Sequence, residues 1–151
     1  MTFEARNGTR GARQPGRWML WINKLTAGAI RKRGHAMGFK ALVMTTVGRK
    51  SGAERQTPVS CFPEDDGSWL IVASANGAAR NPAWYYNLAA HPNEVRVETG
   101  GRTVAVTAHE LHGTERDEAW RRITTAGPRF AGYQKKTDRQ LPVIRLVPAP
   151  S

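Results

Sequence analysis

The segment 45–52, which reads Thr-Thr-Val-Gly-Arg-Lys-Ser-Gly, brings hydroxyl groups, cations and glycines together within a few residues. It follows the apolar run 42–44, so it lies at the end of a predicted strand, where glycine lets backbone N–H groups approach an anion closely. These are the properties of a phosphate-binding turn. A P-loop is excluded, because that motif has four residues between its first glycine and its Gly-Lys pair, whereas Arg49 alone separates Gly48 from Lys50. The alternative is a basic hairpin turn that contacts only water.

A second segment, 73–82, leads from an apolar run into a predicted helix and consists mainly of small residues. Small side chains leave backbone N–H groups exposed, so a flat ligand could lie against them. The N-terminus of the following helix adds a partial positive charge, which Arg80 reinforces. The alternative is a strand-to-helix turn whose residues are small only for packing.

The helix after this segment is predicted over residues 83–90. Asn81 and Pro82 indicate its start, as N-cap and first helical residue, and His91-Pro92 ends it. Three consecutive aromatic residues, 84–86, are more typical of core than of a ligand wall. Of these, Trp84 is the one that we expect to be positioned toward a ligand.

The formal net charge of +11 is concentrated at one end of the chain. Residues 1–50 hold eleven Lys or Arg and one acid, whereas residues 51–151 hold twelve and eleven. This distribution argues against a nucleic-acid-binding protein that is basic throughout. Cys61 is the single cysteine, and metal-ligand spacing of Cys or His pairs is absent, so we expect no disulfide, no metal site and a cytoplasmic location.

Three regions follow one another along the chain. Residues 1–17 are rich in Arg, Gly and Pro and are predicted to form a mobile basic arm. Residues 18–38 are predicted to contain an amphipathic helix, which either covers the core or an oligomer contact, or lies on an anionic membrane. In the second case residues 1–33 would make a peripheral membrane contact. Residues 39–151 are predicted to form the main domain.

The main domain is predicted to be mainly β with appended helices. Short runs rich in Val, Ile, Thr and Trp, separated by turn residues, indicate antiparallel strands over 41–47, 55–62, 69–73, 94–99, 102–110 and 143–147. A second helix is expected from Thr114, with Asp117 as a variant of the capping box. The absence of βαβ alternation and of GxGxxG excludes a Rossmann domain and favours a small β-barrel.

Several of these motifs, in this order and spacing, resemble the deazaflavin (F420)-dependent nitroreductase family, also described as F420H2-dependent quinone reductases. They are the segments 46–52, 71–74, 81–88, 91–92 and 137–139, with Arg55, Pro58 and Pro142. The resemblance covers residues 40–148. It implies a split β-barrel of the flavin-reductase (FMN-binding-like) type, usually a homodimer, that binds coenzyme F420 and is found mainly in actinobacteria.

The resemblance also implies which residues bind the coenzyme. Arg49, Lys50 and Ser51 would hold its phosphate or acidic tail, with Arg55 nearby and Gly48 and Gly52 shaping the turn. The residues that would contact the deazaflavin ring are Pro58, Ala73, Ser74, Gly77 and Ala78, with Asn81 and Trp84 at the base of the pocket.

The implied reaction is hydride transfer from the reduced coenzyme to an electron-poor small molecule, such as a quinone, a nitro compound or an activated enone. Ser74 could hydrogen-bond the ring or the acceptor, and Tyr133 or solvent could supply the proton. The chain has Ser-Ala-Asn-Gly at 74–77 where the family has Ser-Lys-Gly-Gly, and it keeps one tyrosine within 127–133. The alternatives are a non-catalytic F420-binding or storage protein, and a nucleic-acid or membrane-surface protein that uses the basic arm.

Overall fold

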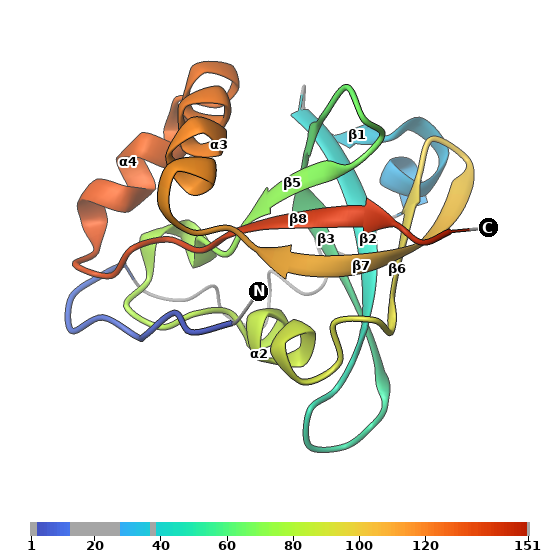
Figure 1. The fold of residues 1–151 in the computed structure, drawn as a ribbon, viewed down its shortest axis with the longest axis horizontal. Coiled ribbons are helices and arrows are strands. Elements are labelled where there is room, and N and C mark those ends of the chain that lie inside the picture. Colours follow the sequence, from blue (N-terminus) through green and yellow to red (C-terminus); the bar gives the residue numbers. More distant parts are fainter. Residues whose placement is uncertain (1–2, 13–27, 37–38, 151) are drawn as a thin grey trace.

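The fold of residues 3–12, 28–36 and 39–150 is described by a computed structural model and drawn in Figure 1. The strands among these residues form one eight-stranded sheet in which all neighbours are antiparallel. They are β1 (His35–Ala36), β2 (Phe39–Val47), β3 (Glu54–Ser60), β4 (Phe62–Pro63), β5 (Trp69–Val72), β6 (Val95–Thr99), β7 (Arg102–Glu110) and β8 (Val143–Pro148).

The sheet curls into a partly closed barrel. The strands follow the order β1, β2, β6, β7, β8, β5, β4, and β3 pairs with β2 outside this path. Only Cys61 separates β3 from β4, so one short stretch of chain pairs first with β2 and then with β5. The β3–β4 segment thereby links the β2 side of the sheet to its β5 side. The predicted strand over 55–62 is therefore divided at Cys61, and the other predicted strands agree with the observed ones to within two residues.

The inside of the barrel is filled by alternate residues of its strands, as the period-two pattern predicts. In β6 and β7 these are Val95, Val97, Val106 and Ala108, while the residues between them face outward. The helix α2 (Ala83–Ala90) contacts β2 and adds buried side chains to the same cluster. The barrel interior and α2 thus share one core.

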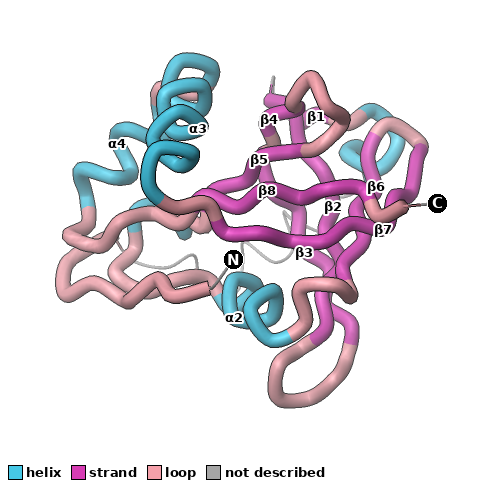
Figure 2. Tube along the Cα trace, viewed as in Figure 1, coloured by secondary structure: helices cyan, strands magenta, loops and turns pink. Residues whose placement is uncertain are grey.

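β5 is buried on both faces. Ile71 belongs to the barrel core, whereas Leu70 and Val72 belong to a second cluster on the other side of the sheet. That cluster includes residues of α3 (Gly113–Ala126) and α4 (Arg129–Lys136), which lie together beside the ends of β5 and β8 (Figures 1 and 2). The loop that follows β5 therefore starts from a strand that is fixed by packing on both faces.

The helix starts differ from the predicted ones. Helix α2 has the predicted bounds, but Pro82 is its N-cap, and the side chain of Asn81 does not cap it. The predicted role of Asn81 as N-cap is therefore wrong, because that side chain is bound elsewhere. Helix α3 begins at Gly113 with His112 as N-cap, and no side chain of its first turn, Thr114 included, caps it. Helix α4 was not predicted, since Gly127-Pro128 and Gly132 obscure its pattern.

The N-terminal region is only partly described. Of the predicted helix over 18–38, residues 28–33 are helical and residues 35–36 form β1, while residues 13–27 lie outside the described part of the chain. Within the predicted mobile arm, residues 3–12 lie against the main domain and hydrogen-bond to it. We refer to residues 3–12 as the N-terminal strap. The membrane contact of residues 1–33 stays a prediction.

None of the helices in the described part of the chain is long and apolar enough to cross a membrane.

The position of Cys61 between β3 and β4 makes a testable prediction about its thiol. Cys61 is 5% exposed, and burial raises its pKa to about 12, although Lys40 acts slightly in the opposite direction. Because the thiolate is the reactive form, iodoacetamide at pH 8 should alkylate native Cys61 on the order of a thousandfold more slowly than a free thiol. Mass spectrometry of the alkylated protein measures the rate. The same protein in denaturant is the control, and equal rates in the two states would contradict the buried position.

Candidate functional site

The loop between β5 and α2, residues 73–81, has an unusual backbone. Three consecutive residues have positive φ: Ala75 at 44°, Asn76 at 56° and Gly77 at 84°. They form the short 3-10 helix η1 (Ala75–Gly77). A left-handed conformation costs a non-glycine residue about 1 kcal/mol or more, and Ala75 and Asn76 are the non-glycine residues in the described part of the chain that adopt it. The surrounding structure must therefore hold this loop in place.

Arg139 is the main group that holds the loop. Its side chain is buried, with the residue 4% exposed, and it donates hydrogen bonds to backbone carbonyls from three different positions. Nε donates to Ala78 O at 2.8 Å, Nη1 to Ala73 O at 3.1 Å, and Nη2 to Ser74 O at 2.8 Å. Nη1 also donates to Asn81 Oδ1 at 2.8 Å. Among the described residues no carboxylate pairs with Arg139, and burial lowers the pKa of its guanidinium.

These bonds give the 73–81 loop two chemically different sides. The carbonyls of Ala73, Ser74 and Ala78 point to Arg139, and that of Ala75 accepts from Ala78 N. The carbonyls of Gly77 and Ala79 accept from the strap. In contrast, the N–H groups of residues 74–76 donate to no other group in the described part of the chain. Successive free N–H groups in a left-handed turn form a concave donor surface that binds electron-rich atoms.

The turn between β2 and β3 forms a second, cationic surface. Gly48 N donates to Ala53 O at 2.8 Å, and Gly52 N donates to Gly48 O at 2.9 Å, which closes the turn. The hydroxyl oxygen of Ser51 accepts from Ala53 N at 3.1 Å, so its own hydrogen can still be donated outward. The side chains of Arg49, Lys50 and Arg55 are exposed. Three positive charges are therefore exposed in this turn and at the start of β3.

Helix α2 connects the turn to the loop. Asn87 Oδ1 accepts from Arg49 N at 3.1 Å, and Asn87 Nδ2 donates to Thr46 Oγ1 at 3.4 Å. The Arg49 guanidinium lies over the ring of Tyr86, 4.7 Å from its centroid. The Tyr86 hydroxyl in turn accepts from Asn81 Nδ2 at 3.5 Å. Helix α2 thus joins the two segments that the sequence predicts to bind an anion and a ring.

The predicted ring-contacting residues divide into two groups. Ala73, Ser74, Gly77 and Ala78 lie together in the 73–81 loop. Asn81 is bound to Arg139, so it supports the loop from within. The remaining two come from other elements. Pro58 is in β3 opposite Val43, and Trp84 packs against the barrel core.

No hydrogen bond joins the two predicted catalytic side chains, Ser74 and Tyr133, both of which lie in the described part of the chain. The ring of Tyr133 packs edge-on against Phe130, with centroids 5.5 Å apart, and belongs to the second core cluster. Its backbone lies close to the loop, because a Cβ added at Gly77 would be 2.7 Å from Tyr133 O. The catalytic roles of Ser74 and Tyr133 stay predictions.

Two residues of this site were not predicted to act in it. Arg139 and Asn87 both occur in the motifs on which the family resemblance rests, but spacing alone gives no reason to connect Arg139 with a loop some sixty residues earlier. Their presence in those motifs was the signal in the sequence that could have pointed to these two residues.

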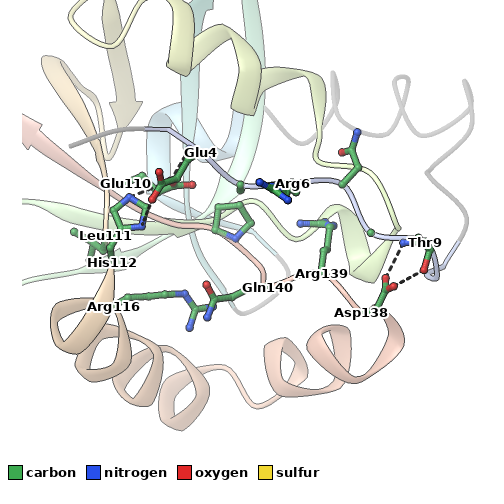
Figure 3. Close-up of a pocket in the computed structure, with 14 residues that line it drawn as sticks. Glu4, Arg6, Thr9, Glu110, Leu111, His112, Arg116, Asp138, Arg139 and Gln140 are labelled. Carbon is green, nitrogen blue, oxygen red and sulfur yellow. Dashed lines mark hydrogen bonds and ion pairs between the residues drawn. The ribbon is translucent and has the colours of Figure 1, made fainter.

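A cavity of about 560 Å³ lies between the strap, the end of β7, the start of α3 and residues 138–142, on the side of Arg139 and the strap (Figure 3). Its most buried acid, Glu110, accepts from the Tyr85 hydroxyl at 2.6 Å and from Glu4 N at 3.1 Å, and it contacts His112 Nε2 at 3.3 Å. Burial and the bond to Glu110 raise the pKa of Tyr85. The carboxylate of Glu110 is thus occupied by structural contacts. None of the residues predicted to contact the coenzyme lines this cavity.

No cluster of three or more His, Cys, Asp or Glu side chains suited to a metal occurs in the described residues.

Comparison with known proteins gives consistent relatives. A family model described as F420H(2)-dependent quinone reductase matches residues 17–148. The F420H(2)-dependent quinone reductase Rv1261c of Mycobacterium tuberculosis is 34% identical over 109 residues, which is 70% of this chain and 72% of the relative.

Solved structures agree. An F420-H2 dependent reductase, FDR-A, is 39% identical with a TM-score of 0.64 and covers 70% of this chain and 92% of its own. A domain-swapped dimer is 34% identical with a TM-score of 0.67, covering 85% and 98%. A FAD-binding protein of Mesorhizobium loti, 11% identical with a TM-score of 0.51 and covering 91% of each chain, shares the fold. These likenesses confirm the predicted split β-barrel with appended helices.

Replacement of Arg139 tests how the loop is held. In Arg139→Met the carbonyls of Ala73 and Ala78 lose their donor in a buried place, so the free energy of unfolding should fall by on the order of 3 kcal/mol. Urea denaturation measures this change. The matched control is Arg122→Met, which removes a surface ion pair with Glu64 and should cost less than about 1 kcal/mol. Equal losses in the two variants would show that Arg139 does not hold the loop.

Proposed function

Because the chain belongs to the F420H(2)-dependent quinone reductase family, we propose that it reduces a quinone with a hydride from coenzyme F420, which binds across the 73–81 loop and the 48–53 turn. Membership of the family makes the protein an F420-dependent oxidoreductase. The observation that carries the placement of the coenzyme is the two-sided loop, whose carbonyls are taken by Arg139 and the strap while its N–H groups remain available.

The free N–H groups of residues 74–76 suit the polar edge of a deazaflavin, which carries carbonyl oxygens that accept hydrogen bonds. Ala73, Ser74, Gly77 and Ala78 would line the ring, with Ser74 as the half-buried member and the other three buried. A side chain at Gly77 would meet the carbonyl of Tyr133, so this part of the loop has no room for a larger residue. The donor set therefore fits the polar edge of the ring.

The exposed cations of the 48–53 turn suit the anionic part of the coenzyme. Arg49 and Lys50 would bind the phosphate or acidic tail, and Ser51 would donate its hydroxyl hydrogen, with Arg55 adding charge. Gly48 and Gly52 close the turn that presents these groups. The contact of the Arg49 guanidinium with Tyr86 limits its rotation and so prepares it for binding.

The protein contributes orientation more than acid–base chemistry. When bound, the reduced deazaflavin supplies the hydride, and a quinone takes that hydride and one proton to become a hydroquinone. Ser74 would hydrogen-bond the ring or the acceptor. Tyr133 or solvent would supply the proton. Nitro compounds and activated enones are further electron-poor acceptors that the same arrangement could serve.

The alternative function is an F420-binding or storage protein without turnover, because the same binding surfaces would serve it.

The protein is also proposed to act as a homodimer. A 34% identical relative that is a domain-swapped dimer, and that aligns over 98% of its length, supports this.

Neutralising the cationic turn tests the placement of the coenzyme. The variant Arg49→Gln/Lys50→Gln should bind F420 about tenfold more weakly, because two exposed charge contacts with an anion are lost. Fluorescence titration with F420 measures the dissociation constant, which should depend less on salt than that of the wild type. Arg102→Gln, an exposed charge at the other end of the barrel, is the control. Unchanged affinity in the double variant would refute the cationic turn as the tail site.

Turnover separates the enzyme from the storage protein. Wild-type protein mixed anaerobically with reduced F420 and menadione should regenerate the absorbance of oxidised F420 at many times the rate without protein. Nitro compounds and enones are tested as acceptors in the same way. Binding of the coenzyme without turnover of any of these acceptors would favour the storage function. Lack of F420 binding at micromolar protein would exclude both functions.

The homodimer predicts a particle of twice the chain mass in sedimentation velocity at micromolar concentration. A monomer across that range would contradict it.

A further inference from the structure

The N-terminal strap is bound to the 73–81 loop by main-chain contacts. Gly8 N donates to Ala79 O at 2.6 Å, Ala12 N donates to Gly77 O at 2.9 Å, and Ala12 forms an isolated parallel bridge with Ala78. Main-chain bonds of this kind hold a segment against exposed backbone. The strap thus supplies the donors for two loop carbonyls that Arg139 does not reach.

A side chain of the strap ties the loop to helix α2. Asn7 Oδ1 accepts from Asn81 N at 2.9 Å and from the Tyr86 hydroxyl at 2.9 Å. Tyr86 is the residue on which the Arg49 guanidinium lies. One amide oxygen of the strap therefore contacts both the end of the loop and the residue that positions the cationic turn.

Two carboxylates, both far away in the sequence, anchor the strap. Asp138 Oδ1 accepts from Thr9 N at 2.8 Å and from Arg10 N at 3.1 Å, and its Oδ2 accepts from the Thr9 hydroxyl (Figure 3). Glu110 accepts from Glu4 N at 3.1 Å. The bonds from Thr9 and Arg10 lower the pKa of Asp138 to about 2. Because this pKa is lowered, the anchor is fully present above the ordinary pKa of about 4 and is lost as the pH falls toward 2.

Asp138 and Arg139 are consecutive residues, and one accepts hydrogen bonds from backbone N–H groups while the other donates to backbone carbonyls. Arg139 binds the carbonyls of the loop, and Asp138 binds the amides of the strap, which in turn binds the loop. The close approach of the strap is possible because Gly8 and Gly11 have no side chain. An added Cβ would lie 2.3 Å from Asp138 Oδ1 at Gly8, and 2.3 Å from Ala79 N at Gly11.

We propose that the N-terminal strap is part of the coenzyme site, in which Asp138 is a positioning residue that holds the strap against the 73–81 loop so that the loop presents its N–H groups to the coenzyme. The inference rests on the proposed function. Without the strap, the carbonyls of Gly77 and Ala79 and the N–H of Asn81 lose their partners, and the left-handed residues 75–77 lose part of what holds them. The strap also occupies the carbonyl side of residues 77–79, which leaves the N–H side for the coenzyme.

Two pairs of variants test the strap. Gly11→Ala forces the strap away from Ala79, and its control is Gly132→Ala in α4, where an added Cβ meets no atom within 4 Å. Asp138→Ala removes the anchor, and its control is Asp66→Ala, whose carboxylate likewise accepts from an N–H and a hydroxyl, but only those of Ser68 in its own turn. Hydrogen exchange of the amides of residues 7–12 and 74–79 reports docking of the strap and order of the loop in each variant, without coenzyme.

Both test variants should raise the KM for reduced F420 about tenfold, since release of the strap removes the two main-chain hydrogen bonds by which it holds the loop. The KM for menadione and both controls should stay within about twofold of wild type. A purely structural role would instead lower the active fraction, and thus kcat, with the KM for F420 unchanged. That result, or unchanged KM in variants whose amide exchange shows a released strap, would overturn the inference while the proposed function stood. Lack of F420 binding by the wild type would defeat the proposed function, and this inference with it.

Discussion

The 73–81 loop depends on a buried guanidinium, that of Arg139, which pairs with no carboxylate in the described part of the chain. Removing a cation from water is costly unless its hydrogen bonds are replaced, and Arg139 replaces them with the carbonyls of Ala73, Ser74 and Ala78 and the amide oxygen of Asn81. These acceptors can converge on one planar group only because the backbone between them turns through three left-handed residues. The same interaction therefore accounts for the strained loop and for the way its carbonyls are occupied while the N–H groups of residues 74–76 are not.

The barrel determines where this interaction can form. β5 is covered on both faces, so the loop that leaves it starts from a fixed point, and Arg139 lies just before β8, the partner of β5. Helix α2 follows the loop and packs on β2, which leads into the cationic turn. The two ligand-binding segments thus come from neighbouring parts of one core. Their relative position is set by packing rather than by a flexible linker.

Local patterns in the sequence are sufficient for the longer strands, for the bounds of α2 and for the turn at 48–53, because alternation, proline and glycine act over a few residues. They do not predict β1 or the break between β3 and β4. They are not sufficient for Asn81, whose side chain binds Arg139 rather than the helix N-terminus. Nor do they predict docking of the strap. Its composition indicates that it cannot build a core, and it does not need one, since backbone N–H groups bound to Asp138 and Glu110 hold it. Such contacts join residues more than a hundred positions apart, which no local pattern encodes.

The distribution of titratable groups fits hydride transfer. The buried acid Glu110 and its neighbours Tyr85 and His112 interact with one another beside the cavity next to the strap, whereas the loop proposed to bind the coenzyme contains backbone donors and small side chains. A reaction whose reactive atoms belong to the coenzyme and the acceptor requires alignment and exclusion of water, and it needs at most one proton from the protein or the solvent. Rigidity of the loop is then the property that the protein must supply. Arg139, Asn81 and the strap, which support the loop from its carbonyl side, matter as much to such a site as the residues that touch the ring.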